Sequence, residues 1–411
     1  MSSLLRRLPL PRLLLLCATA VAVGIGCTAL ASALGNDPKP APKPLAQAIH
    51  DALTAPNLEG FSARVSLTNH LIEGANIQGQ EPGGGSSSPL LSGGEGRVWI
   101  AADGRIRLEL QSEKGATELL YDGSTTTLYQ ASSNTLYQYT PPARQGERSS
   151  QQTAADSGHV PSVAEIQEAI THLMGHADLS GAVPTDVGGQ PAYAVRISPA
   201  RNGGLVGGAE LAWDATHGVP LRLAIYAKGQ SAPVLALTAT DVSYGPVPSS
   251  VFSLSLPAGV KTTKIAPPKG GADGQHEGHQ GRPHVNATTT GVAAVQAKLP
   301  FTLQAPATLA GMSRHEVRLV EVDGHDAALA SYGEGLGGII VVESQAKQGV
   351  GSQTEEGSSP LTLPHVSING AKATELPTAL GTLLSFSSSG VDHLLVGSVT
   401  PSVLQTAARG L

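Results

Sequence analysis

Alternation with a period of two residues is the feature that most constrains the fold of this chain. In residues 105–110 the apolar side chains Ile106, Leu108 and Leu110 alternate with charged ones, so that each strand has one apolar and one polar face. Similar short patterns recur through residue 260 and are separated by turn residues such as Asp103-Gly104 and Asp122-Gly123. Half-buried strands joined by tight turns predict a large antiparallel sheet.

Two helical patterns are available to cover this sheet. Residues 45–53 place apolar side chains four residues apart, and residues 163–174 carry an apolar stripe. Ser162 and Glu165 form the S-x-x-E pattern of a capping box at the start of the second helix. Because the sheet has more apolar surface than two helices can cover, either a cavity or a closed packed core is expected.

The amino terminus predicts export. Arg6, Arg7 and Arg12 precede an apolar stretch over residues 13–33 that ends in small residues, which is typical of a signal peptide or of a membrane anchor over residues 1–33. Cys27 is a candidate for lipidation. The protein is therefore expected outside the cytoplasm, at the outer face of the cell membrane or secreted.

Charge and cysteine content exclude several classes of function. Cys17 and Cys27 both lie in the apolar stretch, so a cleaved chain has no disulfide, thiolate metal site or cysteine nucleophile. Beyond residue 33 the chain has 23 basic and 32 acidic residues, a net charge of −9. This negative charge disfavours nucleic-acid binding.

Composition divides the chain further. Residues 34–44 are Pro-rich and predict a stiff spacer. Residues 45–260 form the first predicted domain, residues 261–298 a disordered Gly/His/Pro linker, and residues 299–411 a smaller second domain. Surface loops are expected at residues 78–94, 140–158 and 346–359.

The order of motifs in the first domain resembles the LolA-like lipoprotein carriers and the RseB-like regulators. These motifs are a strand with Trp99, a turn and strand, the run from Tyr121 to Tyr129, and a hairpin with Trp213. The resemblance extends to the segment from Phe252 to Val260. It implies an incomplete antiparallel barrel with a helical lid over a cavity for acyl chains. The RseB-like regulators add a smaller second domain and hold an anti-sigma factor.

One position departs from the carrier pattern. Carriers often have an Arg-Pro pair soon after the strand tryptophan, where the arginine binds the lid, but Trp99 is followed by Ile100 and then Ala101-Ala102-Asp103. The carrier's latch is therefore absent from this place. The second domain, over residues 299–411, resembles small α+β domains of anti-sigma-type bacterial surface proteins, with a hairpin expected over residues 328–343.

No motif predicts catalysis, a metal or a cofactor. His276, His279 and His284 lie in the predicted linker without helical spacing for a metal. The G-x-G-x-x-G sequence at Gly333 is followed by a β-branched strand pattern rather than by a helix that would hold a phosphate. No G-x-S-x-G sequence marks a serine hydrolase.

Together these features predict an α+β protein that is not an enzyme. It has a large curved antiparallel sheet, few covering helices and a smaller second domain. The predicted function is binding of a lipid or lipoprotein acyl chain, as a carrier or sensor; the alternative is an RseB-like regulator that binds a membrane anti-sigma factor or another envelope partner. The predicted cavity lining comprises Trp99, Ile106, Leu108, Leu110, Leu128, Trp213, Leu223 and Ile225.

Overall fold

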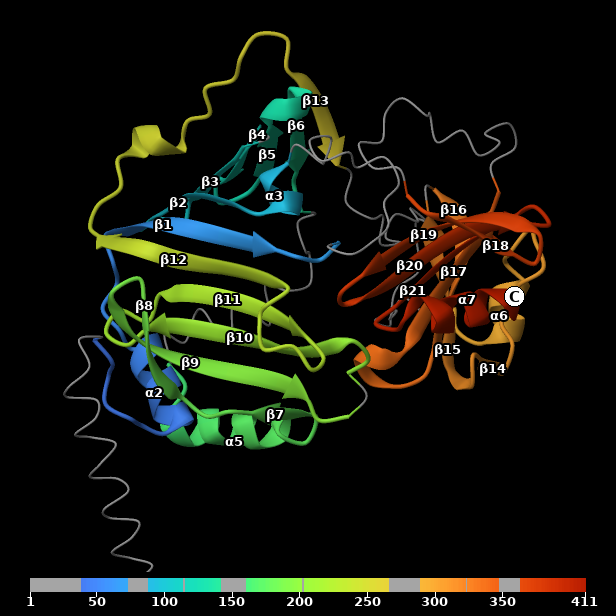
Figure 1. The fold of residues 1–411 in the computed structure, drawn as a ribbon, viewed down its shortest axis with the longest axis horizontal. Coiled ribbons are helices and arrows are strands. Elements are labelled where there is room, and N and C mark those ends of the chain that lie inside the picture. The colour runs from blue at the N-terminus through green and yellow to red at the C-terminus, as the bar shows by residue number, and fades with distance from the viewer. Residues whose placement is uncertain are drawn as a thin grey trace, which may run out of the picture.

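The computed structural model contains two β-sheets with few helices (Figure 1). It describes residues 38–72, 88–113, 115–141, 160–201, 203–265, 289–322, 324–346 and 363–411. The predicted signal or anchor, Cys27 and the linker histidines lie outside the described residues. Within the described ranges, no helix combines the length and the apolar character needed to cross a membrane.

The first sheet is long and antiparallel except at one edge. Its strand order is β13-β6-β5-β4-β3-β2-β1-β12-β11-β10-β9-β7, with β8 paired to β9. The strands are β1 (Gly60–Asn69), β2 (Gly94–Ala101), β3 (Ile106–Ser112), β4 (Gly115–Tyr121), β5 (Thr126–Gln130), β6 (Thr135–Tyr139), β7 (Ala177–Leu179), β8 (Val183–Val187), β9 (Gln190–Pro199), β10 (Val206–Asp214), β11 (Pro220–Ala227), β12 (Leu235–Tyr244) and β13 (Lys261–Ile265).

Three helices belong to this sheet. Helix α2 (Leu45–Leu53) packs on β9 and β10, where Ala48, Tyr193 and Trp213 share a buried cluster. Helix α5 (Val163–Leu173) packs on α2, and the short α3 (Pro89–Ser92) contacts β1, β3 and β4. We call the face that carries α2 and α3 the inner face of the sheet, and the opposite face the outer face.

Both helices predicted from the sequence are present. Helix α2 has the predicted bounds, and α5 begins at the predicted residue. The capping box is complete, because Ser162 Oγ accepts a hydrogen bond from Glu165 N at 3.3 Å and Ser162 N donates to Glu165 Oε2 at 2.8 Å. It satisfies two backbone donors at the start of the helix.

Two segments expected to be irregular contain regular structure, and the segment predicted to be a stiff spacer makes a long-range contact. Helix α3 lies inside the loop predicted over residues 78–94, and β13 and α6 (Val292–Gln296) occupy the two ends of the predicted linker. The Pro-rich segment contacts the first sheet, since Tyr193 Oη donates to Ala41 O at 2.6 Å. These segments are ordered by long-range contacts, which local composition does not encode.

The second sheet forms a separate antiparallel layer with its own core. Its order is β14-β15-β16-β17-β21-β20-β19-β18. The strands are β14 (Thr308–Leu309), β15 (Met312–Val322), β16 (His325–Tyr332), β17 (Ile339–Gln345), β18 (His365–Ile368), β19 (Ala371–Thr378), β20 (Gly381–Ser388) and β21 (Val391–Gly397). Helix α7 (Pro401–Arg409) contributes Leu404, Ala407 and Ala408 to the core, which also contains Val295 of α6.

The predicted fold class is confirmed. A large sheet with few helices is followed by a smaller sheet with two helices (Figure 1). The hairpin predicted over residues 328–343 is formed by β16 and β17, which pair from Ala327 opposite Ser344 to Tyr332 opposite Ile339.

Candidate functional site

The inner face of the first sheet carries an exposed apolar patch on β10, β11 and β12. Leu223 on β11 pairs with Leu211 on β10 and with Leu237 on β12, and Ile225 pairs with Leu235. Leu223 is 55% exposed and Ile225 36% exposed. On the same sheet, α2 covers the neighbouring β9 and β10 residues Tyr193 and Trp213 instead.

The patch continues across the sheet as rows of half-buried side chains. Leu237 pairs with Leu67 on β1. Further along, Val98 pairs with Leu108, Leu108 with Leu119, and Leu119 with Leu128. Since side chains alternate between faces along a strand, these residues lie on one side of the sheet.

Seven of the eight predicted lining residues share this inner face, and their environments differ. Leu223 and Ile225 are exposed, and Ile106, Leu108 and Leu128 are half-buried. Leu110 is buried beside the region that α3 covers, and Trp213 is buried in the α2 cluster. Leu110 and Trp213 therefore belong to packed regions of the inner face.

Trp99 lies on the outer face. It pairs with Arg107, whereas its neighbour Ile100 pairs with Ile106 and occupies the inner position. The guanidinium of Arg97 lies 5.6 Å from the centre of the Trp99 ring. The register of β2 against β3 therefore places Trp99 and Ile106 on opposite faces of the sheet.

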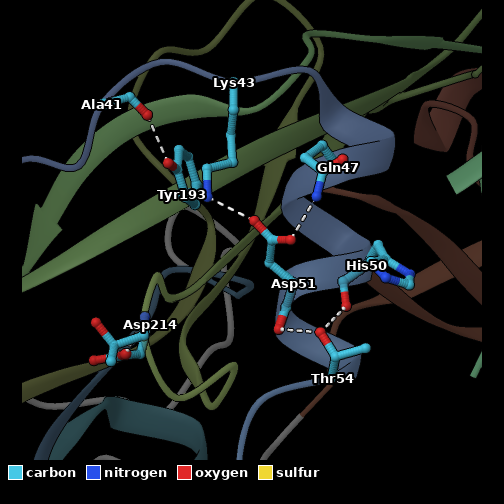
Figure 2. A network of polar contacts seen from close by, with 9 residues as sticks. Ala41, Lys43, Gln47, His50, Asp51, Thr54, Tyr193 and Asp214 are labelled. Atoms are coloured by element: carbon cyan, nitrogen blue, oxygen red, sulfur yellow. Dashed lines mark hydrogen bonds and ion pairs between the residues drawn. The ribbon is translucent and has the colours of Figure 1, made fainter.

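A polar network joins Lys43, which precedes helix α2, to side chains along the helix (Figure 2). Lys43 Nζ donates to Asp51 Oδ2 at 2.6 Å, and Gln47 Nε2 donates to Asp51 Oδ1 at 2.6 Å. The hydrogen bond from Lys43 lowers the pKa of Asp51, and the same bond raises the pKa of Lys43. The spacer and the helix that covers β9 are thus connected to each other.

Asp214 organises the turn between β10 and β11. This carboxylate is 1% exposed. Its Oδ1 accepts from Thr216 N at 2.7 Å and from His217 N at 2.6 Å, and its Oδ2 accepts from Tyr244 Oη at 2.6 Å. Burial, then the bond to Asp214, raises the pKa of Tyr244.

His217 completes this turn without forming a catalytic triad. Its Nδ1 lies 3.1 Å from Asp214 Oδ1, and its ring stacks on Tyr244 with centres 3.9 Å apart. Among the hydrogen bonds of the described residues, none joins His217 to a serine or threonine hydroxyl. A triad needs such a nucleophile on the second ring nitrogen, so the Asp214–His217 pair acts as a turn-stabilising contact.

The second sheet has an exposed apolar face that the sequence did not reveal. Ile340, Leu394 and Val396 are 45%, 37% and 41% exposed. They adjoin three half-buried residues through the strand pairs Ile340–Val396, Val342–Leu394, Leu329–Val342 and Leu383–Val396. We call these six residues the outer stripe of the second sheet. The opposite face of these strands carries the core under α7.

The two sheets meet through main-chain contacts. Leu205 N donates to Ser398 O at 2.9 Å and lies 3.0 Å from Ser398 Oγ, and Ala379 N donates to Leu71 O at 2.9 Å. A recess of about 470 Å³ beside this junction is lined by His70, Leu205, Lys228, Val234, Ala379 and four neighbouring residues. The relative placement of the sheets therefore depends on two pairs of loops.

The described part of the chain contains no cluster of side chains that could form a metal site. Among those residues, no group of three or more His, Cys, Asp or Glu side chains is placed to hold a metal ion. The His276–His284 segment lies outside them.

Comparison with known proteins gives structural likeness only. No family model matches the sequence, and no curated protein sequence matches it. The complex of MucA and MucB from Pseudomonas aeruginosa is similar with a TM-score of 0.41 and 14% identity, over 89% of this chain and 96% of that chain. MucB in complex with MucA(peri) gives a TM-score of 0.37 and 13% identity, over 89% and 94%.

A third similar structure covers less of the chain. It is an uncharacterized conserved protein from Thermus thermophilus, with a TM-score of 0.31 and 12% identity, over 54% of this chain and 99% of that chain. At such identities and TM-scores, likeness does not assign a function. The structure itself defines a protein of two β-sheets, each of which has exposed apolar residues on one face.

Proposed function

We propose that this protein is an exported, non-catalytic regulator that holds an envelope partner protein. The observation that carries the proposal is the outer stripe of the second sheet, on which Ile340, Leu394 and Val396 are exposed together. Contiguous apolar surface on a soluble domain usually marks a contact with another molecule. A membrane-anchored partner such as an anti-sigma factor fits the RseB-like resemblance of the sequence.

The form of this surface favours a protein over a lipid chain. The outer stripe lies on the face of the second sheet opposite the core under α7 and is formed by the neighbouring strands β16, β17, β21 and β20. Small apolar ligands are usually enclosed by concave walls, whereas a protein interface has an apolar centre with a polar rim. Ser331 and Ser385, which pair with Ile340 and Leu394, supply polar groups beside the stripe.

Substitution of the stripe tests the proposal. Ile340→Asp places a charge on an exposed position, so the fold is retained while partner capture is expected to fall at least tenfold. Val183→Asp is a matched control, because Val183 is a strand residue of the first sheet with 48% exposure. Equal capture by both variants of a tagged, exported protein from envelope extracts would reject the stripe as the interface.

Lipid binding is a second candidate, favoured by the exposure of Leu223 and Ile225 on the inner face. An acyl chain gains about 0.8 kcal/mol for each buried methylene, so no catalytic group is required. Leu223→Glu and Leu108→Glu are expected to abolish binding of a fluorescent acyl probe in a folded protein. Unchanged binding in both variants rejects this second function.

A further inference from the structure

One edge of the first sheet is formed by β13, which pairs in parallel with its neighbour. Strand β13 pairs with β6 in parallel, from Lys261 opposite Thr135 to Ile265 opposite Tyr139, whereas every other strand pair in the described sheets is antiparallel. Figure 1 shows the yellow segment that leaves the end of β12, arches over the sheet and returns as β13 beside β6. The edge of β6 is therefore covered by a distant part of the chain.

The first part of this arching segment is firmly held. Arg107 on β3 donates through Nη1 to Val251 O at 2.6 Å and to Ser253 O at 3.1 Å. Its Nη2 donates to Glu118 at 2.8 Å and is 2.5 Å from Glu109. Phe252, between the two carbonyls, is buried, and the Arg105 guanidinium lies 4.7 Å from its ring centre.

The last part has few side-chain contacts. Four of the five β13 residues are exposed, including Ile265 at 49%. No side-chain hydrogen bond or ion pair of the described residues involves Lys261 or Lys264, and the strand is held by main-chain bonds such as Lys261 N to Asn134 O at 3.0 Å. Parallel pairing is also slightly less stable than antiparallel pairing. Such weakly packed elements open locally without unfolding the rest.

The stretch between the two parts is exposed to solvent. Residues 255–259 are exposed and contain Pro257 and Gly259, and Gly259 has a φ of +77° with no atom near its missing side chain. Lysine on an edge strand discourages further strand addition, which argues against docking on the free side of β13. Exchange at β6 needs only the separation of β13 from Thr135–Tyr139.

We propose that β13 is a resident edge strand that a partner's extended segment replaces on β6. The edge accepts a parallel strand with β-branched residues beside Tyr137 and Tyr139, as Thr263 and Ile265 lie now. Main-chain pairing supplies the affinity and these alternate side chains supply the specificity. The inference deepens the proposed function and rests on it, since it names where a partner segment is received.

A disulfide lock tests the exchange within one variant. Gln138 and Lys264 are opposite in the register of β6 and β13, and the other cysteines, Cys17 and Cys27, are replaced by serine. In Gln138→Cys/Lys264→Cys protein, oxidation fixes β13 and reduction releases it. The probe is a fluorescent peptide of residues 258–265, with binding measured by anisotropy.

The expected result is at least tenfold tighter peptide binding after reduction than before it. A second variant, Thr262→Pro/Thr263→Pro, removes the pairing of β13 and is expected to bind as tightly as the reduced lock or better. A peptide with proline at the same two positions is the control and should not bind. Equal binding by oxidised and reduced protein, or no binding to the proline variant, overturns the exchange.

The strand exchange and the proposed function can fail independently of each other in these experiments. If Ile340→Asp protein loses its partner while the peptide fails to bind any variant, only the strand exchange is rejected. If the peptide binds as expected while Ile340→Asp captures its partner normally, the outer stripe is rejected instead.

Discussion

Two ionisable side chains, Glu343 and His393, are buried beside each other in the second sheet. Glu343 on β17 is 1% exposed, and its Oε2 accepts from Gln304 N at 2.9 Å. Glu343 Oε1 and His393 Nδ1 lie 3.8 Å apart, and neither atom has a hydrogen-bond partner among the described residues. Burial raises the pKa of Glu343 to about 7 and lowers the pKa of His393. Both groups are therefore favoured as neutral species in the core of the second sheet.

This raised pKa predicts a pH-dependent stability. Because the folded pKa of Glu343 exceeds its unfolded value, its contribution is complete below about pH 4.5 and is lost as the pH rises through 7. His393 acts in the opposite direction, because its lowered pKa costs stability as the pH falls below 6.5. Glu343→Gln should reduce the loss of stability between pH 5 and pH 8 by about 2 kcal/mol.

Urea unfolding of the full chain, monitored by hydrogen exchange in β17 and β21 of the second sheet, measures this difference in stability. His393→Gln is the companion variant and should preserve the loss at high pH. An identical pH profile for wild-type and Glu343→Gln protein would show that the carboxyl does not titrate in the folded state.

Individual elements are held by contacts that differ in strength. Helix α5 has a complete capping box at Ser162, whereas the first residue before α7, Thr400, makes no side-chain capping bond. The arching segment from Ser249 to Ile265, which we call the strap, is held near its start by hydrogen bonds from Arg107. Strand β13 at its end is held by main-chain pairing with β6. Local stability is therefore expected to vary along the chain.

The capping box predicts a local effect. Ser162→Ala should destabilise α5 by about 1 kcal/mol, since one backbone N–H loses its acceptor. Thr400→Ala at the start of α7 is the matched control and should cost much less. Hydrogen exchange of the two helices measures both, and an equal cost at the two positions would contradict the role of the cap.

The Arg107 contacts predict release of the strap. Arg107→Met leaves two carbonyls and the paired carboxylates of Glu109 and Glu118 without their donor, a loss of about 3 kcal/mol for a partly buried network. Limited proteolysis should then cleave residues 254–260 faster. Arg105→Met is the control, because it removes the contact with Phe252 but not the hydrogen bonds to the strap. This variant should change the cleavage rate little. Similar cleavage rates for the two variants would contradict the conclusion that Arg107 holds the strap.

Much of the element pattern could be predicted from the sequence, because it depends on local periodicity. The alternation around Ile106 and Leu108 predicted β3, and Ser162 with Glu165 predicted the start of α5. Strand register could not be predicted, so Trp99 was grouped with residues that lie on the opposite face of the sheet. Strand β13 was missed because Lys261-Thr262-Thr263-Lys264 has no apolar alternation and is fixed by pairing with a distant β6.

At the scale of the whole molecule, the junction of the two sheets decides which surfaces can act together. Gly204 has a φ of +60°, and a Cβ there would lie 1.9 Å from Ser398 O. Only glycine permits this approach. The apolar surfaces of the two sheets carry the proposed binding functions, so their relative placement is expected to matter for a partner that spans both.

Gly204→Ala is expected to separate the sheets without unfolding either. Its Cβ cannot be accommodated against Ser398, and small-angle scattering should show an increased radius of gyration. Gly229→Ala is the matched control, because Gly229 also has a positive φ, +76°, but has no atom within 4 Å of a Cβ. An unchanged radius in Gly204→Ala would mean that the junction tolerates the side chain.

Photo-crosslinking in cells tests whether the outer stripe of the second sheet contacts a partner protein. A photoreactive phenylalanine analogue at Leu394, on the outer stripe, is compared with the same group at Ser402, exposed on α7. We expect that Leu394 crosslinks a membrane-anchored protein, that Ser402 does not, and that Ile340→Asp abolishes the adduct. Adducts only with lipid, or the same proteins from both positions, would contradict partner binding by the second sheet.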